Sequence, residues 1–171
     1  MCLELILGGA RSGKSRFAEQ RALQSGLEVI YIATATAGDA EMATRIAHHQ
    51  QHRPQHWQTV ETPVYLAEAF QTYVHPQTCL LVDCLTLWLN NCLFDKTVCW
   101  ETQRQLFLAQ IAELPGHQIL VSNEVGQGIV PLGAESRQFV DESGRLHQAL
   151  ATLADRVFFV VAGLPQVLKG N

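Results

Sequence analysis

Short apolar runs alternate along the chain with longer stretches in which apolar and polar positions recur at helical spacing. The apolar runs predict β-strands over residues 3–7, 28–33, 57–61, 79–83, 118–122 and 156–161, with residues 156–161 as the last strand. Helical spacing predicts helices over residues 14–25, 39–51, 64–73, 85–94, 98–114 and 136–154. Because the strands lack polar alternation, we predict an α/β fold with a mostly parallel central sheet and helices on both faces.

The residues that follow the predicted strands are the expected place for a ligand. Open α/β sheets bind ligands at the carboxyl ends of their strands. In this chain those positions are residues 8–15, residues from Thr34 onward, Asp83, and the pair Asn123 and Glu124. We therefore expect the functional site to lie along one edge of the sheet.

The segment after the first strand carries a complete P-loop, the phosphate-binding motif G-x-x-x-x-G-K-[ST]. It consists of Gly8, Gly9, Ala10, Arg11, Ser12, Gly13, Lys14 and Ser15. The glycines let backbone N–H groups approach phosphate oxygens, and the following helix adds the positive end of its dipole. We expect Lys14 to contact the outer phosphates and the Ser15 hydroxyl to coordinate Mg²⁺. The motif predicts a P-loop NTPase-like fold that binds a nucleoside triphosphate.

Asp83 ends a buried apolar run, which is the usual position of the second Mg²⁺-coordinating acid in a P-loop protein. The same position would also suit a helix N-cap or an aspartate in solvent at the end of a strand. An Mg²⁺ site formed by Ser15 and Asp83 is therefore one of two interpretations of this residue.

Composition limits the possible functions. The length of 171 residues fits one domain with a sizeable core. A net charge of −4 gives no electrostatic support for a nucleic acid or membrane partner. No apolar run approaches the roughly 20 residues of a membrane-spanning helix. Five cysteines without a C-x-x-C pair predict reduced, mostly buried thiols and a cytoplasmic protein.

Four of the seven histidines lie close together, namely His48, His49, His52 and His56. The i, i+4 spacing of His48 and His52 could hold a metal ion, but no acidic or cysteine partner has a suitable spacing, so a polar helix face explains it better. At about 100° per residue, Met42, Ile46 and His49 share one stripe of the predicted helix, and His48 lies about 100° away. We therefore expect His49 to face the protein and His48 to face solvent.

Four segments carry a more specific signal. They are G-G-A-R-S-G-K-S at residues 8–15, Y-I-A-T at 31–34, E-M-A-x-R-I-x-H-H-x-x-x-R-P-x-H-W at 41–57, and N-E-V-G-x-G-I-V-P at 123–131. Together, and in this order, they resemble the bifunctional adenosylcobinamide kinase / adenosylcobinamide-phosphate guanylyltransferase family. The similarity covers nearly the whole chain and is weakest over residues 65–117.

The resemblance implies two reactions in cobalamin (vitamin B12) biosynthesis, catalysed by a single domain over residues 1–171. First, ATP or GTP phosphorylates the aminopropanol hydroxyl of adenosylcobinamide. Second, GTP transfers GMP to that phosphate, giving adenosylcobinamide-GDP and pyrophosphate. The resemblance further implies Mg²⁺ as cofactor, a small-molecule corrinoid as substrate and a homotrimeric assembly.

The resemblance also implies a GMP-histidine intermediate on one of the two adjacent histidines. The helical stripe favours His49, and a neutral imidazole is both a good nucleophile near pH 7 and a good leaving group from phosphorus. Lys14 would offset charge as pyrophosphate leaves. Further nucleotide-binding positions implied by the resemblance are Ala33, Thr34, Ala35, Gln50, Gln51, His52, Arg53, Glu61 and Asp83. For Asn123 and Glu124, binding of the corrinoid and binding of Mg²⁺ stay open.

Three other functions are alternatives at this point. A P-loop small-molecule kinase without guanylyltransferase activity would use the same loop and leave His49 structural. A GTP-binding regulatory switch normally carries N-K-x-D for guanine, and the chain contains no such segment. A metal-binding regulator built on the histidine cluster would leave the P-loop unexplained.

Overall fold

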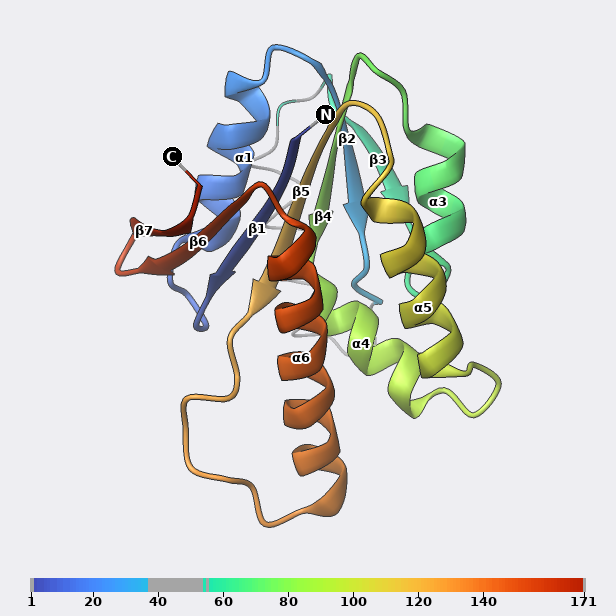
Figure 1. Cartoon of the computed structure of the whole chain (residues 1–171), viewed down its shortest axis with the longest axis vertical. Coiled ribbons are helices and arrows are strands. Elements are labelled where there is room, and N and C mark those ends of the chain that lie inside the picture. The colour runs from blue at the N-terminus through green and yellow to red at the C-terminus, as the bar shows by residue number, and fades with distance from the viewer. Residues whose placement is uncertain (1, 37–53, 55, 171) are drawn as a thin grey trace.

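The computed structural model describes residues 2–36, 54 and 56–170, which form one sheet flanked by helices (Figure 1). The strands are β1 (Cys2–Gly8), β2 (Glu28–Ala33), β3 (Gln58–Glu61), β4 (Thr78–Asp83), β5 (His117–Asn123), β6 (Arg156–Val161) and β7 (Leu164–Lys169). Their order across the sheet is β3-β2-β4-β5-β1-β6-β7. Every neighbouring pair is parallel except β6 and β7, so the predicted mostly parallel sheet is confirmed.

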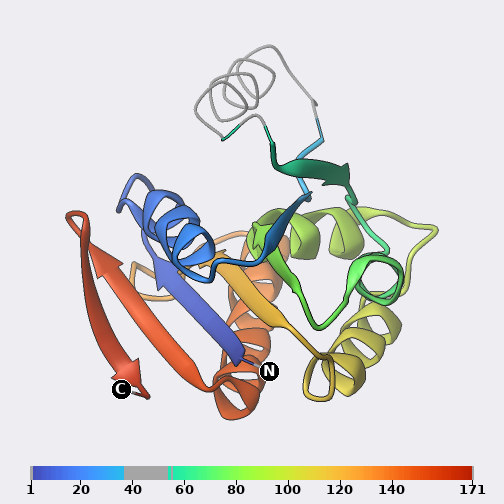
Figure 2. The same cartoon turned by 90° about the horizontal axis from the view of Figure 1, so that it is seen from above.

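Helices cover both faces of the sheet, as Figure 2 shows from above. The described helices are α1 (Lys14–Gln24), α3 (Leu66–Tyr73), α4 (Leu85–Phe94), α5 (Trp100–Ile111) and α6 (Ala134–Leu153). Helix α1 packs on one face, and α3, α4, α5 and α6 pack on the other. The helix predicted over residues 39–51 lies outside the described residues.

Strand β2 shows why the predicted strands lack polar alternation. Ile30 and Ile32 pack into the apolar core beneath α3 to α6, whereas Val29 and Tyr31 pack into the core beneath α1. Successive side chains of a strand point to opposite faces, and here both faces are covered. An uninterrupted apolar run is therefore what a central parallel strand requires.

The prediction that residues 156–161 form the last strand is wrong, because β7 follows and pairs antiparallel with β6. The two strands join through Ala162 and Gly163, whose φ angles of 52° and 79° suit a tight two-residue hairpin turn. Pro165 makes this strand difficult to predict from the sequence, because proline lacks the N–H that a central strand needs. Proline is tolerated here because β7 is an edge strand with exposed side chains.

The five cysteines are free, and Cys79, Cys84 and Cys92 are buried, so the predicted mostly buried thiols are confirmed. Burial raises the pKa of Cys79 and of Cys92 to about 12, which keeps both thiols protonated at neutral pH. None of the helices in the described ranges combines the length and the apolar character needed to cross a membrane.

Candidate active site

The carboxyl edge of the sheet brings together residues that are far apart in the sequence. Ala33 at the end of β2 is in register with Glu61 of β3 on one side and with Asp83 of β4 on the other. Gly8 at the end of β1 is in register with Asn123 of β5. Those predicted strand-end residues that the structure describes therefore lie along one edge of the sheet.

The P-loop connects β1 to α1 in a conformation that depends on its glycines. Gly13 has a φ of 93°, a conformation that side chains other than glycine rarely adopt. A Cβ atom on Gly8 would lie 2.5 Å from the Ser12 Oγ and 2.7 Å from the Val160 carbonyl oxygen. The loop thus folds back on itself and against β6, with no room for side chains at these two glycines.

Lys14 and Ser12 place polar groups within this loop. The Lys14 side chain is buried, and its Nζ donates a hydrogen bond of 3.2 Å to the Gly9 carbonyl. Among the described residues, the buried Ser12 Oγ has no hydrogen-bond partner. Buried polar groups normally have a partner, so an unpaired hydroxyl inside a P-loop fits an oxygen-rich ligand such as phosphate. Ser15 is half-buried in the first turn of α1.

Thr34 fastens the end of β2 to the end of β4. Its hydroxyl donates a hydrogen bond of 2.7 Å to the Cys84 carbonyl and accepts one of 2.9 Å from the Cys84 N–H. The Asn91 side chain donates to the Thr34 carbonyl at 2.9 Å and to the Pro63 carbonyl at 3.0 Å. The Thr34 hydroxyl is therefore engaged in holding the edge together, while Ala35 beside it is half-buried.

Asp83 is half-buried at the end of β4, immediately before the N-cap of α4. The N-cap residue is Cys84, so the structure excludes the helix-cap interpretation of Asp83. Glu61 ends β3 and is exposed. The remaining predicted site residues, which are His49, Gln50, Gln51, His52 and Arg53, lie outside the described residues, as does His48.

A chain of polar groups lies beside the P-loop, and the sequence patterns did not predict it. The Asn123 N–H donates to the Thr86 Oγ1 at 2.7 Å, and the Thr86 and Ser122 hydroxyls lie 3.2 Å apart. The Ser122 Oγ lies 2.7 Å from the His147 Nε2, and the His147 Nδ1 lies 3.6 Å from the Glu124 Oε2. This chain runs from the end of β5 through α4 and α6 and ends on a carboxylate.

His147 is the buried centre of that chain. Desolvation by burial lowers its pKa, although the nearby Glu124 carboxylate acts in the opposite direction. Helical spacing in the sequence could have predicted that His147 is buried. It lies at helical spacing from Ser143, Leu146 and Leu150, the other buried residues of α6. Its partner in β5 could not be inferred from that spacing.

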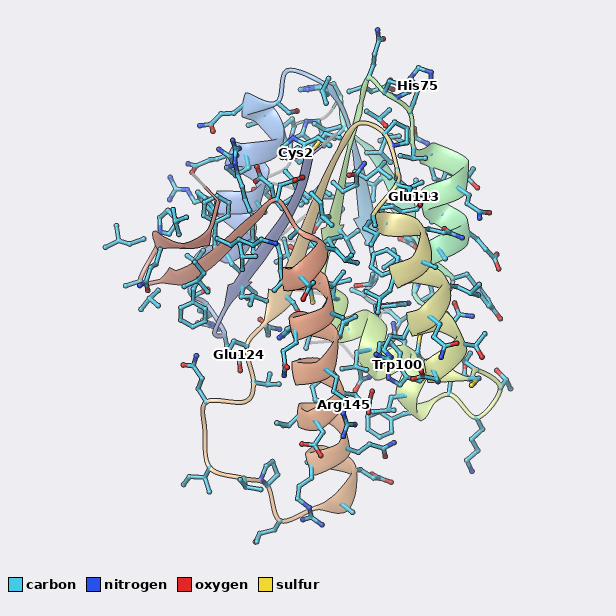
Figure 3. The ribbon with its side chains drawn as sticks, in the orientation of Figure 1. Cys2, His75, Trp100, Glu113, Glu124 and Arg145 are labelled. Carbon is cyan, nitrogen blue, oxygen red and sulfur yellow. The ribbon has the colours of Figure 1, made fainter. Side chains whose placement is uncertain are left out.

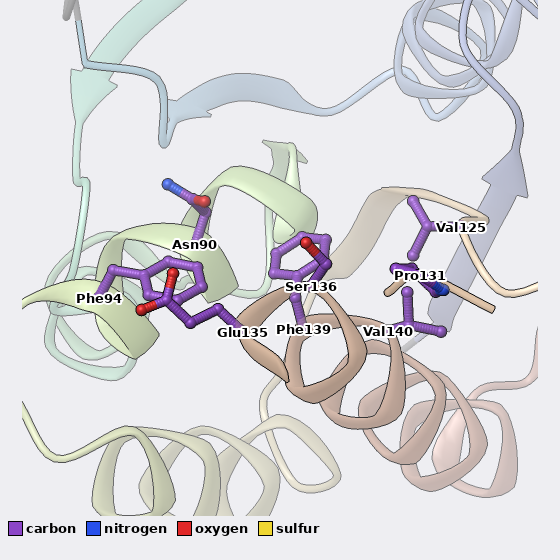
Figure 4. A pocket seen from close by; sticks show the side chains of 8 residues that line it. All are labelled: Asn90, Phe94, Val125, Pro131, Glu135, Ser136, Phe139 and Val140. Carbon is purple, nitrogen blue, oxygen red and sulfur yellow. The ribbon is translucent and has the colours of Figure 1, made fainter. Parts of the chain in front are cut away.

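An open pocket of about 350 Å³ adjoins this edge, between α4, α6 and the segment that joins β5 to α6 (Figure 4). Its lining is largely apolar and consists of Asn90, Phe94, Val125, Pro131, Glu135, Ser136, Phe139 and Val140. Val125, which lines the pocket, is the residue that follows Glu124 in the sequence.

At the opposite edge of the sheet, the Cys2, Glu4 and His117 side chains bring possible metal ligands within 4.8 Å of one another. The Glu4 carboxylate, however, already pairs with the guanidinium groups of Arg21 and Arg156. Two cations on the only carboxylate of this group disfavour a metal ion there. We therefore interpret this group as a buried structural ion pair network.

Comparison with known proteins identifies relatives over almost the full chain. The family described as "Cobinamide kinase / cobinamide phosphate guanyltransferase" matches residues 4–168. The bifunctional adenosylcobalamin biosynthesis protein CobP of Pseudomonas aeruginosa is 57% identical over 169 residues, which cover 98% of each chain. The bifunctional adenosylcobalamin biosynthesis protein CobU of Escherichia coli is 41% identical, over 96% of this chain and 98% of the relative.

Solved structures with the same fold are much less similar in sequence. The flagellar accessory protein FlaH from Methanocaldococcus jannaschii aligns with a TM-score of 0.55 and 14% identity, over 99% of this chain and 79% of its own. A protein from Pyrococcus horikoshii OT3 aligns with a TM-score of 0.54 and 10% identity, over 98% of this chain and 86% of its own. Together with the loop between β1 and α1, this similarity confirms the predicted P-loop NTPase-like fold.

Proposed function

The chain belongs to the cobinamide kinase / cobinamide phosphate guanyltransferase family, and from this premise we propose how its residues carry out the two reactions. It is a bifunctional enzyme of cobalamin biosynthesis, a cobinamide kinase and a cobinamide phosphate guanylyltransferase. The observation that supports our assignment most directly is the P-loop, which holds the buried Lys14 and a Ser12 hydroxyl that has no hydrogen-bond partner among the described residues.

The P-loop, residues 8–15, is proposed to bind the triphosphate in both reactions. Its backbone N–H groups and the N-terminus of α1 would surround the phosphates, and Lys14 would offset their charge. For the kinase reaction the donor is ATP or GTP, and the acceptor is the hydroxyl of the aminopropanol arm of adenosylcobinamide. For the second reaction the donor is GTP.

Ser15 and Asp83 are the residues that we assign to Mg²⁺. Both lie at the carboxyl edge of the sheet, and Asp83 is not used as a helix cap. A hydroxyl and a carboxylate are oxygen ligands of the kind that Mg²⁺ takes beside phosphate and water. When bound, the ion would offset the negative charge that develops on the phosphates.

His49 is proposed as the nucleophile of guanylyl transfer. A neutral imidazole nitrogen would attack the α-phosphorus of GTP, and the bond from that phosphorus to the pyrophosphate oxygen would break. A phosphate oxygen of the corrinoid would then attack the same phosphorus and release the imidazole. Each step is a single displacement at the same phosphorus, so one site can act first on GTP and then on the corrinoid phosphate.

The nucleotide contacts that we propose surround this chemistry. They are Ala33, Thr34, Ala35, Gln50, Gln51, His52, Arg53, Glu61 and Asp83. Arg53 would neutralise phosphate charge, and Glu61 would accept hydrogen bonds from guanine or ribose. The buried Thr34 has its hydroxyl bonded to Cys84 and its carbonyl bonded to Asn91, so we assign its contact to the backbone N–H.

The covalent intermediate has a direct test. The protein is incubated with Mg²⁺ and GTP labelled at the α-phosphate, then denatured and examined for bound label. We expect label that is labile in acid and stable in base, as for a phosphoramidate, and that is absent from His49→Ala. The exposed His75 provides the control variant His75→Ala, which should label as the wild type does.

Two results would contradict this assignment. Absence of label from the wild type would reject the GMP-histidine intermediate and favour direct attack of the corrinoid phosphate on GTP. Label that persists in His49→Ala but disappears in His48→Ala would move the nucleophile to the neighbouring histidine.

We further propose that residues 1–171 act as a single domain in a cytoplasmic homotrimer. Support for an assembly comes from apolar side chains that are exposed in the segment before α6 and on β7, namely Ile129, Val130, Leu132, Leu164, Val167 and Leu168. Exposed apolar groups of this kind are typical of surfaces that contact another protein. Light scattering coupled to size exclusion would give the mass, and a monomeric mass would contradict the homotrimer.

A further inference from the structure

The carboxylate residues at the functional edge follow strands at different positions relative to the P-loop strand. Within the described residues they are Glu61, Asp83 and Glu124. Glu61 ends β3, which is separated from β1 by β2, β4 and β5, and Asp83 ends β4, which is separated from β1 by β5. Glu124 follows β5, the direct neighbour of β1, so of the three it follows the strand nearest to the P-loop strand.

Glu124 is fixed in this position by its backbone and its side chain. Its N–H donates a hydrogen bond of 3.0 Å to the carbonyl of Gly8, the first residue of the P-loop. Its Oε1 accepts a hydrogen bond of 2.6 Å from the Gly126 N–H, and its Oε2 faces the His147 ring. The side chain is 21% exposed, so the carboxylate is held in place and still reaches solvent. Figure 3 shows Glu124 just past the end of β5, next to α6.

We propose that Glu124 is the general base of the kinase reaction and that His147 is the positioning residue that orients its carboxylate. This inference rests on the proposed function, because it assumes the P-loop site and a hydroxyl acceptor. Val125, the residue after Glu124 in the sequence, lines the largely apolar pocket of Figure 4, and we assign this pocket to the acceptor molecule.

The polar chain described above has a consistent direction when His147 is neutral. Thr86 accepts from the Asn123 N–H, so its hydroxyl hydrogen is free to go to Ser122, and the Ser122 hydroxyl hydrogen then goes to the His147 Nε2. The remaining ring hydrogen is on Nδ1, which faces the Glu124 Oε2. Burial lowers the pKa of His147, which favours this neutral ring. The polar chain thus directs the Nδ1–H of His147 at the Glu124 carboxylate.

The proposed step balances as follows. The substrate hydroxyl gives its proton to a carboxylate oxygen of Glu124 while its oxygen forms a bond to the γ-phosphorus. The bond between that phosphorus and the oxygen bridging to the β-phosphate breaks, and the nucleoside diphosphate leaves with the electron pair. Glu124 then returns the proton to solvent.

Guanylyl transfer requires no such base, and this difference separates a catalytic Glu124 from a structural one. Its acceptor is a phosphate monoester, which has lost its second proton above a pKa of about 6. At pH 8 the attacking oxygen therefore carries no proton to remove. A base for the kinase reaction should be dispensable for GMP transfer in the same protein.

The test measures both reactions on the intact protein at pH 8. Adenosylcobinamide with Mg²⁺ and a nucleoside triphosphate reports the kinase reaction, and separately supplied adenosylcobinamide phosphate with Mg²⁺ and GTP reports guanylyl transfer. For Glu124→Gln we expect the kinase kcat to fall by about 100-fold or more. We expect guanylyl transfer and the KM for the nucleotide to change by less than about threefold.

Two further variants make the test specific. Glu113 is exposed and lies near the opposite edge of the sheet (Figure 3), so Glu113→Gln should retain both activities. At His147, an asparagine amide can occupy the place of the Nδ1–H, so His147→Asn should retain more kinase activity than His147→Ala. Both His147 variants should keep guanylyl transfer.

Each other outcome overturns the proposal in a recognisable way. A kinase kcat of Glu124→Gln within about threefold of wild type would reject the base. A parallel loss of both activities in Glu124→Gln would assign Glu124 a structural role. Equal kinase activities of His147→Asn and His147→Ala would reject the positioning role. If the wild type phosphorylated no hydroxyl at all, the proposed function itself would fail.

Discussion

The backbone N–H of Gly163 donates a hydrogen bond of 2.8 Å to the carbonyl oxygen of Ser12, inside the P-loop. Gly163 belongs to the turn between β6 and β7, so the edge hairpin supports the phosphate-binding loop from the side. The contact is close, because a Cβ atom on Gly13 would lie 3.0 Å from the Gly163 Cα. The shape of a loop near the start of the chain therefore depends on a hairpin at its end.

Gly13→Ala should weaken nucleotide binding by at least about tenfold, because the new methyl group would both strain the positive φ and press on Gly163. Gly26 is a matched control with a φ of 67° and no atom within 4 Å of an added Cβ. Gly26→Ala should cost about 1 kcal/mol of unfolding free energy and leave binding unchanged. Calorimetric titration with a non-hydrolysable GTP analogue measures the affinity of each variant. Equal affinities of Gly13→Ala and Gly26→Ala would contradict the proposed effect of the contact between residue 13 and Gly163.

Thr34→Val should destabilise the protein by about 2 kcal/mol, because the buried Cys84 N–H would lose its bond to the hydroxyl and the Cys84 carbonyl would keep only the Trp88 N–H. It should also lower the kinase kcat, since Asp83 directly precedes Cys84. Thr34→Ser keeps the hydroxyl and is expected to retain most of both properties. Urea unfolding and initial rates measure the two effects, and a Thr34→Val protein as stable as Thr34→Ser would contradict the explanation.

Glu4 should make stability depend on acidic pH. Burial acts to raise its pKa, but hydrogen bonds from Arg21 and the His117 ring 3.4 Å away outweigh burial and lower the pKa to about 2, from an ordinary value of 4.5. The folded-state pKa is depressed, so the stabilisation is complete above pH 4.5 and is lost as the pH falls toward 2. This shift corresponds to roughly 3 kcal/mol at neutral pH.

Glu4→Gln removes this titration. The difference in unfolding free energy between wild type and Glu4→Gln should therefore be largest at neutral pH and shrink by about 3 kcal/mol as the pH falls through that window. Urea unfolding at a series of pH values measures it, with Glu28→Gln at the exposed start of β2 as the control. A difference that stays constant with pH would show that Glu4 is not stabilised as an anion.

Gly126→Ala should act on the kinase reaction through Glu124. A Cβ atom at this position would lie 3.0 Å from the Glu124 Oε1, so the carboxylate would have to shift. Gly128 lies in the same segment with nothing within 4 Å of an added Cβ, which makes Gly128→Ala the control. We expect a fall of about tenfold in the kinase kcat for Gly126→Ala alone, with guanylyl transfer retained. Equal kinase rates for the two variants would contradict the prediction.

The regular part of the fold could be predicted from the sequence because its signals are local. The apolar runs of β1, β2 and β4 and the P-loop between β1 and α1 lie within short segments whose patterns have physical causes in those same residues. The exception, β7, contains Pro165, a residue that strands tolerate only at an edge, and edge position is a property of the whole sheet.

The sequence alone therefore determined the α/β fold, the phosphate-binding motif and, within about one residue, where the parallel strands end. Only the tertiary structure decided which of those residues are neighbours. Parallel strands are joined by long crossovers, so the position of β5 between β4 and β1 cannot be predicted from any single segment of the sequence. That placement set Glu124 beside Gly8, and the packing of α6 on the same sheet brought His147 to it.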